Sequence, residues 1–257
     1  MAEQLDVQVE LGKLRTMYNE VGEIKPSFLI YGDFGTGKTT LLTTCPKPVL
    51  IHSFDPGGML SIRQELMDES CQITADIRFE DESPGMPTAW DAWVKEYKRL
   101  KRAGVLDQLG TFAVDSGTTW SAAALNKVCY AAGRPGGPPF QQDYMPAMSQ
   151  MENAIKDIMT CKCHFVFTCH EDATKDENSG RMFIGPQLIG KLKQRIPLLF
   201  SEMYCAQAQQ TSKGAEYRLL TRATGLNRAR TRLGSHNRFE QFEEPNLTNL
   251  LAKAQKG

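Results

Sequence analysis

The sequence lacks any long apolar run, and no part of it approaches the about 18 consecutive apolar residues of a membrane-crossing helix. The first residues also lack the basic start and apolar core of a secretory signal peptide. The seven cysteines are odd in number and widely scattered, which is not typical of a disulfide framework. We therefore expect a protein of a reducing cytoplasm, with no membrane partner.

Net charge is absent as well, because 30 Lys and Arg balance 30 Asp and Glu. The distribution is uneven: residues 1–180 hold 17 basic and 25 acidic side chains, whereas residues 181–257 hold 13 basic and 5 acidic ones. A basic C-terminal third suits an anionic partner, head-to-tail assembly of subunits, or a solvated face without a partner. With 41% hydrophobic residues, the chain has enough material for a core. We expect a single domain over 1–257, with 1–25 as a lead-in.

The most informative stretch matches the phosphate-binding pattern G-x-x-x-x-G-K-[ST] at every fixed position. An apolar run at 27–31 predicts a buried strand before it, and a helix begins at 40–44 after it. Glycines let successive N–H groups point at a polyphosphate, and the helix N-terminus adds partial positive charge. Lys38 would reach the β- and γ-phosphates, and the Thr39 hydroxyl would bind Mg²⁺. The expected nucleotide-binding residues are Gly32, Asp33, Phe34, Gly35, Thr36, Gly37, Lys38, Thr39 and Thr40.

Further buried strands are predicted at 49–54, 111–116 and 163–168. The strand at 111–116 resembles a Walker B element, which carries a carboxylate to the edge of the sheet beside the phosphate loop. Asp115 is therefore the predicted Mg²⁺ residue, together with Thr39. His170, at the end of the next strand, lies where phosphoryl-transfer enzymes place a γ-phosphate sensor.

Cysteines and histidines between 161 and 170 suggest zinc as another interpretation. On a strand, Cys163 and Cys169 face one side while His164 and His170 face the other, and six residues separate each pair by roughly 20 Å. One ion could be shared only if the strand were broken, so this geometry disfavours zinc.

The remaining segments predict helices at 88–103, 118–131, 144–160 and 247–256, and a hairpin of strands at 202–208 and 217–221. The aromatic residues of the helix at 88–103 are expected in the core. A Gly- and Pro-rich loop at 133–140 is either a contact loop for nucleic acid or an ordinary connection between helices. A second polar loop is expected at 172–182. The expected nucleic-acid contacts are Arg134, Tyr144, Lys175 and Arg181.

Together these pieces resemble the RecA-like core of P-loop ATPases. They are similar to the phage-encoded nucleotide-binding or AAA-type ATPases, some of which are single-strand annealing recombinases. The resemblance covers about residues 25 to 252 and rests on 32–39, 54–58, 111–116, 168–171 and 230–234. It implies an α/β fold with a mostly parallel central sheet flanked by helices and a C-terminal β-hairpin. ATP and Mg²⁺ as cofactors and a homo-oligomer, either ring or filament, are implied as well.

The resemblance also implies roles for three residues outside the loop. In RecA-like ATPases the acid that polarises the attacking water ends the second strand and is usually a glutamate. Asp55 stands there with a shorter side chain, so hydrolysis is expected to be slow, and the alternative is an acid that only shapes the turn before Pro56. Arg230 and Arg232 match the arginine fingers that reach the γ-phosphate of a neighbouring subunit. Hydrolysis would then depend on assembly.

The predicted catalytic residues are Lys38, Asp55, Asp115, His170, Arg230 and Arg232. The first hypothesis is an ATP-hydrolysing phage-type recombination protein that binds and anneals single-stranded DNA, with a single-strand DNA-binding protein as a further partner. The alternative is a nucleotide-gated accessory ATPase, such as a helicase loader or assembly switch, that acts on a protein partner. A small-molecule kinase would need an Arg-rich lid and an acceptor pocket, neither of which is clear in the sequence.

Overall fold

The computed structural model describes residues 6–19, 25–175, 180–212 and 214–256. Its centre is an eight-stranded sheet in the order β10-β9-β8-β1-β5-β4-β2-β3. The strands are β1 (Ser27–Tyr31), β2 (Val49–Ser53), β3 (Ile73–Asp76), β4 (Thr111–Asp115), β5 (His164–Cys169), β8 (Glu202–Thr211), β9 (Gly214–Leu220) and β10 (Phe242–Glu243). From β8 to β3 all neighbours are parallel, whereas β9 and β10 are antiparallel. The predicted α/β class with a mostly parallel sheet is confirmed.

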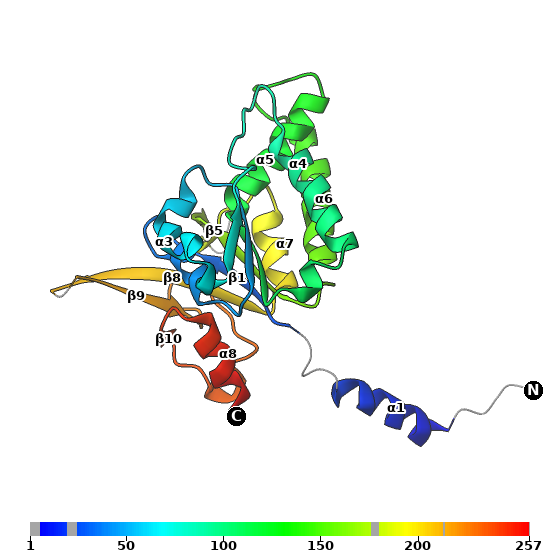
Figure 1. The fold of residues 1–257 in the computed structure, drawn as a ribbon, viewed down its shortest axis with the longest axis vertical. Helices are drawn as coiled ribbons and strands as arrows, with labels where there is room; N and C mark the ends of the chain where they lie inside the picture. The colour runs from blue at the N-terminus through cyan, green and yellow to red at the C-terminus, as the bar shows by residue number, and fades with distance from the viewer. Residues whose placement is uncertain (1–5, 20–24, 176–179, 213, 257) are drawn as a thin grey trace, which may run out of the picture.

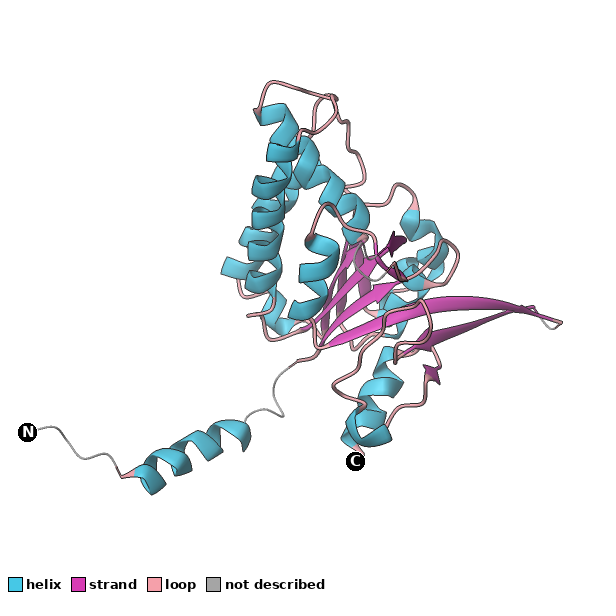
Figure 2. Cartoon of the chain, turned by 180° about the vertical axis from the view of Figure 1, so that it is seen from behind, coloured by secondary structure: helices cyan, strands magenta, loops and turns pink. Residues whose placement is uncertain are grey.

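Helices cover both faces of the sheet (Figure 2). Because side chains alternate along a strand, Leu29 and Tyr31 of β1 pack into one buried cluster, while Phe28 and Ile30 pack into the other. The first cluster is shared with α4 (Ala89–Arg102), α5 (Gly117–Ala131), α6 (Gln141–Ile158) and α7 (Leu192–Leu199). The second is shared with α2 (Lys38–Leu41), η2 (Leu42–Thr44), η3 (Gly58–Ile62), α3 (Arg63–Met67) and α8 (Leu247–Gln255). Short 3₁₀ turns complete the chain at η4 (Glu69–Cys71), η5 (Leu106–Gln108) and η6 (Ser235–Asn237).

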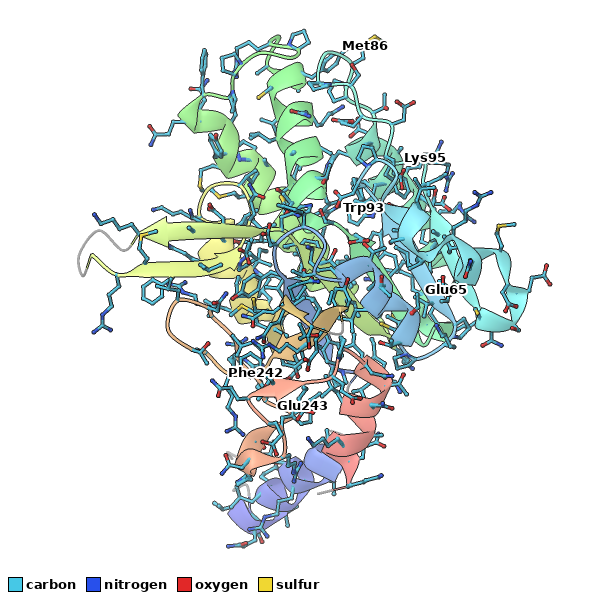
Figure 3. The ribbon with its side chains drawn as sticks, turned by 90° about the vertical axis from the view of Figure 1, so that its left-hand side faces the viewer. Glu65, Met86, Trp93, Lys95, Phe242 and Glu243 are labelled. Carbon is cyan, nitrogen blue, oxygen red and sulfur yellow. The ribbon has the colours of Figure 1, made fainter. Side chains whose placement is uncertain are left out.

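The aromatic stripe of α4 belongs to the core, as expected. Trp93 is completely buried and stacks on Tyr97 with ring centroids 5.4 Å apart. Figure 3 labels Trp93 among the crowded side chains of the interior. Burial of such rings stabilises the layer of α4, α5 and α6 on the sheet.

The C-terminal hairpin and the closing helix are present as predicted, and both strands of the hairpin are longer than predicted. Strands β8 and β9 form the expected hairpin, which extends well beyond the sheet (Figure 1). Helix α8 begins after Asn246, whose side chain accepts a hydrogen bond from the backbone N–H of Asn249, as an N-cap does.

The predicted polar loop at 172–182 is wrong in part. Residues Glu171–Lys175 form β6 and residues Met182–Pro186 form β7, and the two strands pair antiparallel. This hairpin projects from the body in Figure 3. Residues 176–179, between its strands, lie outside the described residues. The apolar run from Met182 to Ile184 is the sequence signal for β7 that the prediction passed over.

The expected lead-in of residues 1–25 contains a helix. Helix α1 (Val7–Asn19) lies apart from the body in Figures 1 and 2. It exposes Val7, Leu11 and Leu14, each by more than two fifths of its surface. No helix in the described parts of the chain is long and apolar enough to cross a membrane.

Candidate functional site

The phosphate loop joins β1 to α2, and its glycines are required by its shape. Gly35 and Gly37 have φ angles of 71° and 80°, a region that residues with a Cβ rarely adopt. At Gly32 the constraint is space, because a Cβ there would lie 2.3 Å from the carbonyl oxygen of Ala206 on β8. The neighbouring strand therefore holds the start of the loop in place.

Lys38, the first residue of α2, folds back over the loop. Its Nζ donates hydrogen bonds to the carbonyl oxygens of Gly32 at 2.9 Å and Asp33 at 2.6 Å. Burial lowers the pKa of this ammonium, and the carboxylates of Asp115 and Asp55 oppose the shift. A buried cation held by two carbonyl groups is ready to exchange them for phosphate oxygens, which bind an ammonium more strongly.

Asp115 ends β4 inside the cavity floor, where it is 2% exposed. Its Oδ2 accepts a hydrogen bond from Thr39 Oγ1 at 2.7 Å, and its Oδ1 accepts one from Thr168 Oγ1 on β5. Burial raises the pKa of this carboxyl group, while the Thr168 and Thr39 hydrogen bonds favour the ionised form. Thr39 and Asp115 together provide a hydroxyl and a carboxylate oxygen, the hard oxygen ligands that Mg²⁺ prefers. The structure thus brings the two predicted metal residues into contact, and they fit the ion.

The strand geometry of residues 163–170 was the reason to disfavour zinc. In the structure Cys163 directly precedes β5 and Cys169 is its last residue, and both cysteines are buried. Over the described ranges, no group of three or more His, Cys, Asp or Glu side chains is arranged to hold a metal ion. Mg²⁺ differs in this respect, because it commonly takes one or two protein ligands and completes its shell with water and phosphate oxygens.

Asp55 follows β2 and turns its side chain into the same cavity. Its Oδ1 accepts hydrogen bonds from Ser116 Oγ at 2.9 Å and from Thr119 Oγ1, and its Oδ2 lies 3.5 Å from His170 Nε2. Burial raises the pKa of this carboxyl group, but the hydrogen bonds from His170, Thr119 and Ser116 outweigh burial and lower it. Asp55 is therefore ionised near neutral pH and is oriented by three side chains, which suits a group that aligns a water molecule.

A cavity of about 520 Å³ joins these groups. It contacts most of the predicted residues, namely Phe34 to Thr40, Asp55, Asp115 and His170. It also contacts residues that sequence reasoning did not name: Leu41, Thr44, Gly58, Ser61, Tyr217 and Pro245. The hydroxyl groups that bind the two aspartates, from Ser116, Thr119 and Thr168, were missed as well. The sequence carried a signal for Thr168, because it lies near the end of the predicted strand that neighbours the strand of Asp115. No sequence signal indicated that Tyr217 would line the cavity.

The two predicted arginine fingers lie outside this cavity and differ from each other. Arg230 Nη2 donates hydrogen bonds to the carbonyl oxygens of Pro197 and Phe200, at 2.8 and 2.7 Å. Arg232 is exposed, and within the described residues its guanidinium makes no hydrogen bond or ion pair. Its backbone is fixed instead, because the buried Glu202 accepts hydrogen bonds from the N–H groups of Arg232 and Leu233 at 2.9 and 3.0 Å.

The expected nucleic-acid contacts lie in two separate regions, the α5–α6 connection with the first turn of α6 and the β6–β7 hairpin. Arg134, in the α5–α6 connection, is ion-paired with the buried Asp143 at 2.6 Å and stacks 4.1 Å from the ring of Phe140. Tyr144 is partly buried and packs on the first core cluster. Both side chains therefore make contacts that stabilise the fold. Lys175 and Arg181, by contrast, are exposed on the β6–β7 hairpin.

A family model and a solved structure are similar to this chain. Among solved structures, a KaiC-like protein from the hyperthermophilic archaeon Pyrococcus horikoshii OT3 is similar over 80% of this chain and 83% of its own, at 12% sequence identity and a TM-score of 0.44. No curated protein matches the chain significantly in sequence. The family model of the AAA domain matches residues 24–233, which include the phosphate loop, Asp55, Asp115 and His170. The chain therefore belongs to the AAA domain family and carries the P-loop ATPase site of such proteins.

Proposed function

We propose that this protein hydrolyses ATP with Mg²⁺ and uses the nucleotide cycle to bind and anneal single-stranded DNA, as a phage-type recombination ATPase assembled from several copies. The observation that carries the ATPase part is one cavity that collects the loop lysine, the Thr39–Asp115 pair and the Asp55–His170 pair. The DNA part rests on the attachment of the β6–β7 hairpin to that cavity at His170. The assembly part rests on the exposed side chain of Arg232.

Each polar group of the cavity has a distinct task in hydrolysis. Lys38 exchanges its two carbonyl partners for β- and γ-phosphate oxygens, and the loop N–H groups bind the same phosphates. Thr39 and Asp115 hold Mg²⁺, which neutralises charge on the phosphates when it is bound. Asp55 accepts a hydrogen bond from the attacking water and aligns it with the γ-phosphate.

His170 links the cavity to the β6–β7 hairpin. It lies between the last residue of β5 and the first of β6, and its backbone N–H donates a hydrogen bond to Thr118 Oγ1 at 2.9 Å. Its carbonyl oxygen accepts a hydrogen bond from the N–H of Gln187, directly after β7. A change at His170 on γ-phosphate binding is therefore passed to both ends of the hairpin that bears Lys175 and Arg181. This attachment supports DNA contact that depends on nucleotide.

The assembly part separates the two arginines. We assign the contact with the neighbouring subunit's γ-phosphate to Arg232, whose side chain is free of intrachain hydrogen bonds in the described structure, whereas Arg230 secures the segment to α7. Arg232→Ala should keep the folded stability and ATP affinity of the parent but lose most of its hydrolysis, because a finger is worth about 10³–10⁵ in rate. Arg230→Ala should lower the melting temperature. Full hydrolysis by Arg232→Ala would contradict the assignment.

The DNA part is tested by binding of labelled single strands as a function of salt, with and without ATP and Mg²⁺. The parent should bind more tightly with nucleotide, and Lys38→Ala should lose that response. Replacing both Lys175 and Arg181 by Ala should reduce the slope of log affinity against log salt by about 1.4, since each phosphate contact to a single strand contributes about 0.7. The matched control replaces Lys95 and Lys98, both exposed on α4 (Lys95 is labelled in Figure 3), and should leave the slope unchanged.

Absence of binding in every nucleotide state would contradict the DNA proposal. One observation favours the other candidate, a nucleotide-gated accessory ATPase, in that case. Helix α1 presents Val7, Leu11 and Leu14 at helical spacing to solvent, and such apolar faces commonly bind other proteins. The ATPase measurements would then stand, and the partner would be a protein.

A further inference from the structure

The nucleotide cavity contacts residues beyond the phosphate loop and the groups that act on the phosphates. One end holds the groups that act on the phosphates, namely Lys38, Asp115, Asp55 and His170. The cavity also contacts Thr40 of α2 and Thr44 of η2. Gly58 and Ser61 of η3 line a further part of the cavity, and Tyr217 and Pro245 line a second wall of it. Because the loop binds the phosphates, this further part of the cavity is left for the nucleoside of a bound nucleotide.

Tyr217 is the aromatic side chain of that second wall. It lies on β9, opposite Ala208 of β8, and its ring approaches the phosphate loop so closely that a Cβ on Gly37 would be 3.3 Å from Cδ1 and 3.6 Å from Cε1. The ring is nevertheless 44% exposed, and its hydroxyl makes no hydrogen bond within the described residues. An aromatic ring that lines the cavity and keeps an exposed side is available for stacking.

The segments that form this wall are fastened to the nucleotide-binding helix. Thr44 Oγ1 accepts a hydrogen bond from the N–H of Leu247 at 3.0 Å, and the Thr44 carbonyl oxygen accepts one from Thr248 Oγ1 at 2.6 Å. These bonds keep Pro245, just before α8, at the cavity. On the other side, the carbonyl of Ala206 abuts Gly32, which fixes β8 and with it the paired β9. The wall is therefore held in position before a nucleotide arrives.

We infer that Tyr217 is the base-stacking residue of this site and selects purine nucleotides, with Pro245 closing the subsite. The inference rests on the proposed ATP binding and adds the residue that recognises the base. A purine is favoured because its two fused rings offer the larger surface to an aromatic side chain, and stacking requires no hydrogen bond to the tyrosine hydroxyl. The β8–β9 hairpin thereby contacts the phosphate loop through Ala206 and the base through Tyr217.

Calorimetric binding to the full chain in Mg²⁺ tests this inference with three ligands: ATP, CTP and inorganic tripolyphosphate. The parent should bind ATP more tightly than CTP. Tyr217→Ala should weaken ATP binding by about 5- to 150-fold, the range expected for loss of one base–aromatic stack. It should leave tripolyphosphate binding unchanged and remove most of the preference for ATP over CTP. Tyr217→Phe should behave as the parent does, because the hydroxyl has no role.

The matched control is Tyr130→Ala, because Tyr130 is similarly exposed, at 47%, but lies near the end of α5 and does not line the cavity. It should change none of the three affinities. If Tyr217→Ala binds ATP as the parent does, the inference is wrong. If it loses ATP and tripolyphosphate equally, Tyr217 supports the phosphate loop at Gly37 and does not stack on a base. A parent that binds neither ATP nor tripolyphosphate would instead overturn the proposed function itself.

Discussion

Replacement of His52 by Phe should remove a specific pH dependence of stability. His52 lies on β2, is completely buried, and packs between the rings of Phe79 and Phe112 with centroids 5.1 and 4.8 Å away. Neither of its ring nitrogens has a hydrogen-bond partner in the described structure. Burial lowers the pKa of His52 from 6.5 to about 4, against the opposing pull of Asp76 and Glu96 and with a small contribution from Arg78 in the same direction.

The magnitude follows from the two pKa values. His52 binds a proton less readily in the folded protein than in the unfolded chain. The free energy of unfolding therefore decreases as the pH falls. The loss begins near pH 6.5, where the unfolded histidine starts to protonate, and is complete below pH 4. A difference of about 2.5 pKa units at 1.36 kcal/mol per unit is at most about 3.4 kcal/mol. We therefore expect His52 alone to cost about 3 kcal/mol between pH 7 and pH 4.

The assay is urea unfolding of the parent and of His52→Phe at several values of pH between 7 and 4. Other groups also titrate in this range, so the difference between the two proteins is the relevant quantity. Relative to the parent, the variant should gain about 3 kcal/mol in its free energy of unfolding by pH 4. The control His236→Asn changes an exposed histidine and should follow the parent. A parent–variant difference that stays constant with pH would refute the reasoning about His52.

Two further predictions concern the strands that carry the site. Thr168→Val removes a hydrogen-bond donor from Asp115 while keeping the shape of the side chain, so half-maximal ATP hydrolysis should need about 10-fold more Mg²⁺. The control Thr111→Val, at the opposite end of β4, should not change the Mg²⁺ dependence; equal effects of both variants would contradict the role of Thr168. Gly117→Ala would place a Cβ 2.1 Å from Cζ of Phe167, so the free energy of unfolding should fall by about 1–3 kcal/mol, and an unchanged urea midpoint would show that the α5–β5 contact is not tight.

Features that are local in sequence were predicted well. The phosphate loop is a contiguous pattern whose glycines and lysine have fixed tasks, and the structure places all of it between β1 and α2 as expected. Asp115 could be assigned because an apolar strand that ends in an acid brings that acid to the edge where the loop lies. The structure places Thr39 and Asp115, which are 76 positions apart in the sequence, in hydrogen-bond contact at that edge.

Features that depend on pairing between distant segments could not be predicted in the same way. Tyr217 reaches the loop because β8 lies beside β1 and β9 folds back on β8, and a single sequence does not contain that register. Arg134 was expected to be available to nucleic acid. In the structure it is ion-paired with Asp143 in the first turn of α6, a contact that the sequence pattern did not indicate. The two fingers looked equivalent in sequence, and the contacts of Arg230 with two carbonyl groups separate them.

The central claim is that the cavity around Lys38 hydrolyses ATP with Asp55 aligning the water. The direct measurement is Mg²⁺-dependent ATP hydrolysis, together with ATP affinity, for the parent, Lys38→Ala and Asp55→Asn. The account predicts that Lys38→Ala loses affinity, whereas Asp55→Asn binds ATP as the parent does and hydrolyses it about 10²- to 10⁴-fold more slowly. A parent without hydrolysis under any condition of assembly or DNA, or an Asp55→Asn variant with full activity, would contradict it.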